Sequence, residues 1–278
     1  MTFETLATGL TFPEAPRWHD GALWFSDMHA HVVLRLDSAG GLDTIAEVPG
    51  GPSGLGFLPD GRMLVVSMHD RRVLRLDPDG LRQHADLGEL APWHCNDMAV
   101  DQNGRAYIGN FGDNTAPPVP PKPTVLIAVE PDGHARVVAD ELMFPNGIVV
   151  TEGGRTLIVA ETRSVPGRLT AFGIQPDGSL AGRRVLAEFG AGELPDGMAV
   201  DAEGGIWVAM PFSGLVVRVS PDGVVTERLE VDSPYAVAVG GPDGGDLFVC
   251  TAPSWVPEEA ARLRGGLLLR TRILRVKL

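Results

Sequence analysis

The sequence predicts an all-β fold, a six-bladed β-propeller with four antiparallel strands in each blade. The first observation is a short motif, clearest as Leu-Pro-Asp-Gly at 194–197, that recurs six times with its third residue at positions 14, 53, 96, 146, 196 and 235. Copies about 40 to 50 residues apart that fill a chain are typical of a circular or stacked repeat array. The second is the abundance of glycine (35) and proline (23) at turns between short apolar runs, which favours many strands over long helices.

Each repeat contains four candidate strands in a fixed order, and the fifth repeat illustrates them. Apolar strands are expected at 198–200 and 206–208, with a glycine-containing turn between them. A third strand at 216–220 alternates apolar with polar residues, and a more polar fourth strand follows at 224–229. Asp-Gly and Asn-Gly pairs at such turns supply the positive φ that tight hairpins need. Apolar inner strands and a polar outer strand are what a propeller blade requires.

The last repeat predicts how the ring closes. Its third strand is expected at 272–276, which leaves no residues for a fourth. The stretch 3–7 is expected to supply that fourth strand, so that the closed ring has no exposed sheet edge. An open all-β solenoid is the alternative. We expect a single domain over 1–278, with a short helix at 258–264 inserted in the last blade.

Charge and composition exclude several classes of partner. The formal net charge is −13 and no long basic run occurs, which argues against nucleic acid and anionic membrane surfaces. No apolar run approaches the ~18 residues of a membrane span, and the N-terminus lacks signal-peptide features, so we expect a cytoplasmic protein. Cys95 and Cys250 stand in apolar contexts and are expected to be reduced and buried. The expected partner is a small-molecule substrate, and the expected state is a monomer or small homo-oligomer.

Four copies of the motif carry an oxygen donor at the third position: Glu14, Asn96, Asn146 and Asp196. The first strand of every blade lines the central channel of a propeller, so these side chains are expected to converge at one depth. Two carboxylates and two amides favour a single Ca²⁺, Mg²⁺ or Mn²⁺ ion. Asn-Gly and Asp-Gly taken alone indicate turns. Their shared register, and the presence of Glu14 in it, favour a metal site instead.

The ends of the second strands are expected to surround the same mouth, because strands one and two form a hairpin. Side chains expected there to contact substrate are Met28, His29, His69, Phe111, Asn114, Glu161 and Phe212. Two insertions, at 115–123 and 253–264, open on this side and are interpreted as lids over a pocket. Decoration without function is the alternative for both.

The motifs together resemble the gluconolactonase, regucalcin and senescence-marker-protein family of six-bladed propellers. The matching pieces span the chain in order: Phe12-Pro13-Glu14-Ala15-Pro16-Arg17-Trp18, Asn96-Asp97 with Val100-Asp101 and Gly104-Arg105, Pro145-Asn146-Gly147, and Pro195-Asp196-Gly197-Met198 with Asp201 and Trp207-Val208. The resemblance implies one divalent metal on the axis, Ca²⁺ or Zn²⁺, held by Glu14, Asn146 and Asp196. It also implies that Asn96 completes the site or touches substrate, and that the activity is hydrolysis of lactones or, in some members, of organophosphate esters.

The sequence departs from the family pattern at two positions near the site. His94 stands where sugar-lactone members commonly carry Arg, and 112–114 reads Gly-Asp-Asn where they often carry Glu. Both departures, with a mouth rich in Met, Phe and Trp, favour a substrate less polar than a sugar lactone.

The function that follows is a metal-dependent hydrolase, a lactonase in which the cation polarises the ester and activates water. Asp196 or His94, which is expected to contact substrate as well, is the candidate general base. No serine stands in a nucleophile motif. The alternatives are an organophosphate or other ester hydrolase on the same site, and a non-catalytic propeller that binds calcium or a small ligand.

Overall fold

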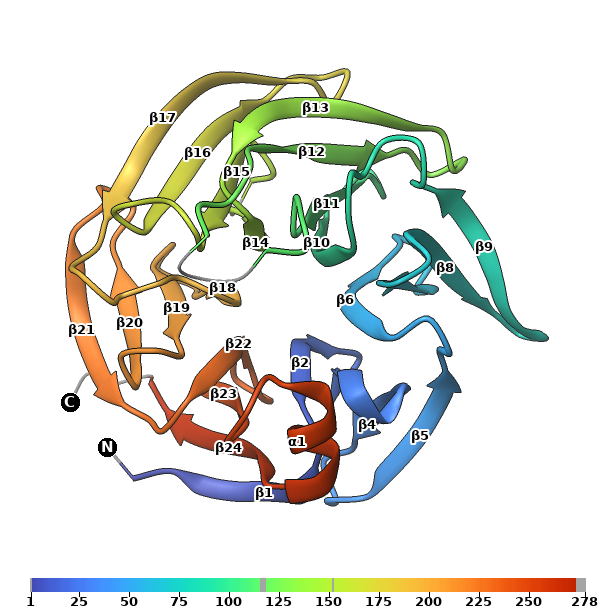
Figure 1. The fold of residues 1–278 in the computed structure, drawn as a ribbon. Helices are drawn as coiled ribbons and strands as arrows, with labels where there is room; N and C mark the ends of the chain where they lie inside the picture. The colour runs from blue at the N-terminus through green and yellow to red at the C-terminus, as the bar shows by residue number, and fades with distance from the viewer. Residues whose placement is uncertain (1, 116–118, 152, 274–278) are drawn as a thin grey trace.

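Six four-stranded antiparallel sheets surround a central bore in the computed structural model (Figure 1), which describes residues 2–115, 119–151 and 153–273. Each sheet is one blade, and its strands follow one another from the bore to the rim. The six-bladed propeller predicted from the repeats is therefore confirmed.

The first three blades are formed by consecutive strands. Blade 1 contains β2 (Pro13–His19), β3 (Ala22–Asp27), β4 (Val32–Leu36) and β5 (Leu42–Glu47), with the 3₁₀ helix η1 (Met28–Ala30) after β3. Blade 2 contains β6 (Pro52–Phe57), β7 (Met63–Ser67), β8 (Arg72–Asp77) and β9 (Gly80–Asp86). Blade 3 contains β10 (Cys95–Val100), β11 (Ala106–Asn110), β12 (Thr124–Val129) and β13 (Ala135–Leu142).

The remaining blades follow the same order, except that the last takes one strand from the other end of the chain. Blade 4 contains β14 (Pro145–Val150), β15 (Thr156–Glu161), β16 (Arg168–Ile174) and β17 (Leu180–Glu188). Blade 5 contains β18 (Met198–Val200), β19 (Ile206–Met210), β20 (Leu215–Val219) and β21 (Val225–Glu230). Blade 6 contains β22 (Pro234–Gly240), β23 (Asp246–Thr251), the helix α1 (Pro257–Leu263), β24 (Gly266–Arg272) and β1 (Glu4–Leu10).

The ring closes where the sequence predicted, through β1. This strand pairs antiparallel with β24, and the Arg270 guanidinium donates to the Glu4 carboxylate at 2.6 Å across the join. The predicted third strand of this blade, at 272–276, is wrong: β24 occupies 266–272, because it must lie antiparallel to β23, with Thr251 opposite Leu267. Residues 274–276 of that prediction lie outside the described residues. The helix predicted at 258–264 is confirmed as α1.

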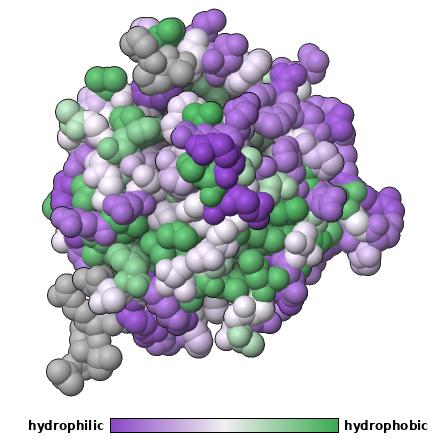
Figure 2. Space-filling view, turned by 60° about the horizontal axis from the view of Figure 1, so that its bottom comes forward, coloured by the Kyte–Doolittle hydropathy of each residue, from purple (hydrophilic) through white to green (hydrophobic). Residues whose placement is uncertain are grey.

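Burial within a blade falls from the middle strands toward the rim. All residues of β7, β11 and β19 are buried, whereas most of β17 is exposed. Large side chains such as Tyr107 and Trp207 are buried in apolar clusters that join neighbouring blades. On the face shown in Figure 2, hydrophobic residues are interspersed among hydrophilic ones. The described residues include no helix of the length and hydrophobicity needed to cross a membrane.

The glycines that follow Asn146 and Asp196 have a packing role. A Cβ at Gly147 would lie 2.2 Å from the carbonyl oxygen of Asp196, and one at Gly197 would lie 2.6 Å from the Cβ of Ala236. Neither glycine has a positive φ. The Pro-X-Gly motif therefore lies at close contacts between neighbouring inner strands and does not form the turn that its composition suggests. These contacts bring the preceding side chains together in the bore.

Candidate functional site

The four side chains expected to hold a metal come from the start of four inner strands and are adjacent in the bore. Asn96 Nδ2 donates to Asn146 Oδ1 at 2.6 Å, and the Asn146 side chain lies close enough to the Asp196 carboxyl to lower its pKa. The exposed fractions of Asn96, Asn146 and Asp196 are 7, 5 and 8%, and Glu14 is partly buried. Glu14 lies close enough to Asp196 for its charge to raise the pKa of Asp196. The structure thus brings together the side chains that the register singled out.

Blade 2 contributes a hydroxyl at the same level. Ser53 Oγ donates to Asn96 Oδ1 at 2.9 Å, while Ser26 Oγ donates to the Ser53 carbonyl at 2.7 Å. Hydrogen bonds therefore join Ser53, Asn96 and Asn146 across three consecutive blades, and Asp196 of the next blade lies beside Asn146. The Ser53 proton is used in orienting Asn96, which fits a supporting role and not that of a nucleophile.

Glu14 is fixed by contacts at the start of β2. The buried Asp27 carboxylate, at the end of β3, accepts hydrogen bonds from the backbone N–H groups of Thr11 and Phe12 and so anchors the segment before Glu14. The Ala15 N–H donates to Glu14 Oε2 at 2.9 Å, and Ala15 itself has a left-handed φ of 49°. Strain of this kind persists only where surrounding contacts hold it.

The two carboxyl groups have strongly raised pKa values. Burial, reinforced by the nearby Asp97 carboxylate, raises the pKa of Glu14 to about 8 against the opposing effects of the Ala15 N–H and Arg17. Burial also raises the pKa of Asp196 well above its usual range, and the negative charges of Glu14 and Asp97 add to the shift. A nearby cation would favour the ionised form of both groups.

The donor set fits a hard divalent cation. Two carboxylates and two amides offer only oxygen ligands and two negative charges, as Ca²⁺ and Mg²⁺ prefer. Across 2–115, 119–151 and 153–273, no three His, Cys, Asp or Glu side chains cluster in a way that could hold a metal. Amide oxygens would therefore have to supplement the Glu14 and Asp196 carboxylates, and Asn96 and Asn146 are placed to do so.

Aromatic and sulfur-containing side chains surround the mouth. Phe12, Met28, Met68, Tyr235 and Ala252 form a buried cluster against which Phe111 packs. Phe111 also stacks on Phe144, with ring centroids 4.5 Å apart. Tyr235 stands at the sixth copy of the motif. Its place in the register identifies it in the sequence, but a tyrosine is neither a carboxylate nor an amide donor.

Histidines form a second group at the mouth. The His94 ring lies 4.7 Å from His69 and stacks on Trp93 at 4.6 Å, and His29 lies 5.1 Å from Phe12. Burial lowers the pKa of His94 and of His69, and a neighbouring histidine adds to each shift. Burial lowers the pKa of His29 as well. These imidazoles therefore remain neutral at pH 7, which leaves His94 able to accept a proton.

Glu161 does not belong to the mouth, contrary to the sequence prediction. Its carboxylate is fully buried and accepts hydrogen bonds from the Arg168 guanidinium at 2.9 Å to each oxygen, from the Met143 N–H and from Thr170. Arg168 and Thr170 reach the Glu161 carboxylate because their strand, β16, pairs with β15.

The other expected contacts differ in exposure. Asn114 and His69 are exposed, Phe212 is 60% exposed, and Met28 is buried.

The two insertions are tied to the blades in different ways. The Arg163 guanidinium donates to the carbonyl oxygens of Thr115 and Val119, each at 2.8 Å, and the Asp113 carboxylate accepts the Lys122 N–H at 2.8 Å. Residues 116–118 of that insertion lie outside the described residues. In the second insertion, the Trp255 carbonyl lies 3.2 Å from His29 Nε2. Both insertions are therefore held by specific polar contacts.

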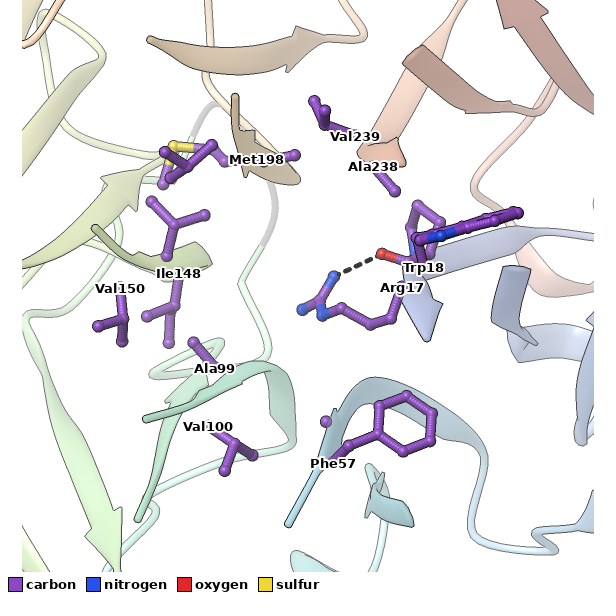
Figure 3. A pocket seen from close by; sticks show the side chains of 15 residues that line it. Arg17, Trp18, Phe57, Ala99, Val100, Ile148, Val150, Met198, Ala238 and Val239 are labelled. Atoms are coloured by element: carbon purple, nitrogen blue, oxygen red, sulfur yellow. Dashed lines mark hydrogen bonds between the residues drawn. The ribbon is translucent and has the colours of Figure 1, made fainter. Parts of the chain in front are cut away.

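A separate cavity of about 330 Å³ occupies the other half of the bore (Figure 3). The lining comes from residues two to four positions beyond the third residue of each motif copy, and its apolar members include Val100, Val150, Met198 and Val239. Arg17 contributes the one charged side chain among the lining residues. None of the four proposed ligands lines this cavity, so it is distinct from the site at the mouth.

Comparison with known proteins identifies the family of the chain. The sequence profile described as the SMP-30/gluconolactonase/LRE-like region matches residues 12–253, from the segment before Glu14 to the last insertion. The chain belongs to this family. The resemblance that the motifs predicted is confirmed.

Three relatives span most of the chain. Pentonolactonase XacC of Haloferax volcanii is 28% identical over 249 residues, which cover 88% of this chain and 83% of the relative. The 6-deoxy-6-sulfogluconolactonase of Pseudomonas putida is 28% identical over 253 residues, with coverage of 86% and 82%. Regucalcin of Xenopus laevis is 25% identical over 254 residues, with coverage of 88% and 85%.

Solved structures share the fold. Regucalcin of Agrobacterium tumefaciens, described as a calcium-binding protein, superposes with a TM-score of 0.80 at 23% identity, over 98% of this chain and 94% of that one. The gluconolactonase of Xanthomonas campestris gives a TM-score of 0.78 at 22% identity, over 97% and 89%.

Proposed function

We propose that this chain is a divalent-metal-dependent lactonase that opens a small cyclic ester. The observation that carries the proposal is the meeting of Glu14, Asn146 and Asp196, with Asn96, in a chain of the gluconolactonase family. These side chains would hold the cation, and Ca²⁺ suits their oxygen donors best. The lactonases among the relatives support the reaction, and the regucalcins support calcium.

The residues of the site have separate roles in the proposed reaction. When bound, a divalent cation would polarise the ester carbonyl and stabilise the charge that develops on its oxygen. His94 is our first candidate for the base that takes the proton from the attacking water, because its lowered pKa keeps the imidazole neutral at pH 7. Asp196 is the second candidate. The hydrogen bonds from Ser53 to Asn96 and from Asn96 to Asn146 hold the two amides in place.

The mouth favours a lactone with an apolar part. Phe111 and Phe144 stack on each other there and are partly exposed, and Phe212 is largely exposed. Such surface binds aliphatic or aromatic rings through apolar contact. Ester or organophosphate hydrolysis would use the same residues, and calcium binding without catalysis is the remaining candidate, favoured by the regucalcin relatives.

The test removes and restores the metal. The protein is stripped with a chelator, Ca²⁺, Mn²⁺ or Zn²⁺ is returned, and hydrolysis of aliphatic, aromatic and sugar lactones is followed. We expect activity to disappear with the chelator and to return with metal. Glu14→Gln should abolish both metal binding and turnover, whereas Glu203→Gln, an exposed glutamate paired with Arg218, should abolish neither.

Turnover that persists in Glu14→Gln would contradict the site. Metal binding without hydrolysis of any lactone or ester would favour the calcium-binding alternative.

A further inference from the structure

One ion pair crosses the bore directly below the proposed metal site. Arg17, on β2 of blade 1, donates from Nη2 to Asp97 Oδ1 and to the Met98 carbonyl on β10 of blade 3, each at 2.7 Å. Its Nη1 donates to the Pro16 carbonyl at 2.9 Å, and the side chain extends into the bore (Figure 3). The pair thus joins two inner strands that are not neighbours in the ring.

The Asp97 carboxylate adds a third blade to this bridge. It accepts a hydrogen bond from the Met98 N–H at 2.8 Å, and the backbone of Ile148 on β14 lies close enough to lower the pKa of Asp97. Asp97 directly follows Asn96, Ile148 is two residues beyond Asn146, and Arg17 is three beyond Glu14. All three blades that the bridge connects therefore carry a proposed metal ligand a few residues earlier on the same strand.

The bridge also separates two environments. The Asp97 side chain is 9% exposed and the Arg17 side chain 21% exposed. Arg17 lines the cavity in the far half of the bore, whereas Asp97 lies close enough to Glu14 and Asp196 for its charge to act on both. The pair therefore lies between the proposed metal site and the apolar cavity in the far half of the bore.

We propose that the Arg17–Asp97 ion pair is a positioning device that fixes blades 1, 3 and 4 relative to one another and so holds Glu14, Asn96 and Asn146 at the spacing of a single metal shell. This inference rests on the proposed metal site. Residues that orient metal ligands affect metal affinity strongly without touching the ion. A planar guanidinium suits the task, because Nη2 donates to Asp97 and Met98 of blade 3 while Nη1 donates to the Pro16 carbonyl of its own strand.

The deciding experiment removes the bridge without changing the net charge around the proposed metal site. Arg17→Met combined with Asp97→Asn deletes one positive and one negative charge, so a change in Ca²⁺ affinity cannot come from altered long-range attraction. The matched control is Arg218→Met with Asp201→Asn, which removes a comparably buried pair (12 and 10% exposed, 2.6 Å) lying within blade 5. Ca²⁺ binding is measured by calorimetry, and the melting temperature is measured in chelator.

We expect the bridge variant to bind Ca²⁺ about 10- to 100-fold more weakly than the wild type. The control pair should lower the melting temperature comparably and leave Ca²⁺ affinity within about twofold, as sites without shared contacts usually behave independently. Equal Ca²⁺ affinity in the bridge variant and the wild type would overturn the inference, as would an equal loss in the control.

Arg17→Lys provides a second measurement that holds even if the double variant fails to fold. Lysine keeps the charge but offers one nitrogen in place of the two through which Arg17 holds Pro16 on one side and Asp97 with Met98 on the other, so we expect Ca²⁺ binding about threefold or more weaker than in the wild type. Affinity equal to the wild type would overturn the inference in that case. A wild-type protein that binds none of Ca²⁺, Mn²⁺ and Zn²⁺ would instead overturn the proposed function itself, and with it this inference.

Discussion

The two halves of the bore differ in chemistry although the same six inner strands line both. Toward the mouth the strands present Glu14, Asn96 and Asn146, and about 10 Å farther along they present valines such as Val100 and Val239 around the far cavity. The scaffold is common to both halves, so the repeat alone does not create the site. The site is created by the side chains that stand at one level of each strand. Substitutions two residues apart should therefore have very different consequences.

The largest contrast is expected between Asp196 and Met198, which are two positions apart. Asp196→Asn keeps the shape of the side chain but removes a charged ligand, so we expect Ca²⁺ affinity to fall by at least about 100-fold and lactone hydrolysis to fall with it. Met198→Leu changes the lining of the far cavity and conserves volume, so stability should change by less than about 1.5 kcal/mol and Ca²⁺ affinity should remain. Calorimetry and thermal melts measure both quantities. Comparable Ca²⁺ losses in the two variants would show that the halves do not differ as proposed.

The mouth half should also respond to pH. The pKa of Glu14 is raised to about 8 in the folded protein from an ordinary value of 4.5. Between those values the folded state binds a proton that the unfolded state has lost, so the metal-free protein should lose stability as pH rises through this window. A bound cation requires the ionised carboxylate, so stabilisation by Ca²⁺ should increase over the same range.

Melting temperatures with and without Ca²⁺, compared from about pH 5 to about pH 8, measure this effect. The difference should widen with pH in the wild type and become flatter in Glu14→Gln. A difference that stays constant across the range in the wild type would contradict the assignment of Glu14.

The position of the site along the bore could be predicted because the repeat register can be read from residue spacing alone. Glu14, Asn96, Asn146 and Asp196 occupy equivalent positions, and equivalent positions in a closed ring meet. Glu161 was expected at the mouth because it ends the second strand of its blade. Its carboxylate is instead bound by Arg168 on the next strand, and residue spacing does not predict that contact.

Contacts across the bore could not be predicted in the same way. The Arg17–Asp97 pair joins blades 1 and 3, so it depends on the width of the bore, which close glycine contacts such as that of Gly147 with Asp196 determine. The Pro-Asn-Gly composition indicated a turn, whereas the backbone there continues as strand β14. Local propensity was overridden at this point by packing between neighbouring blades.

Ser53 tests whether the chain of hydrogen bonds around the mouth matters beyond the ligands themselves. Ser53→Ala removes the donor to Asn96 Oδ1 and leaves the charged groups untouched, so we expect Ca²⁺ affinity to fall by about tenfold. Ser164→Ala removes a buried hydroxyl that donates only to the Glu161 and Pro166 carbonyls, and it is the matched control. Stability should drop by about 1 kcal/mol in both variants, since each loses a buried hydrogen bond.

The two serines separate orientation from packing. If Ser53→Ala loses stability but binds Ca²⁺ as tightly as Ser164→Ala does, Asn96 needs no orientation by blade 2. Its place in the metal shell would then have to be withdrawn, leaving Glu14, Asn146 and Asp196. If the affinity falls only in Ser53→Ala, the second blade contributes to the site through a hydroxyl that binds no metal, and the polar half of the bore includes three consecutive blades joined by hydrogen bonds.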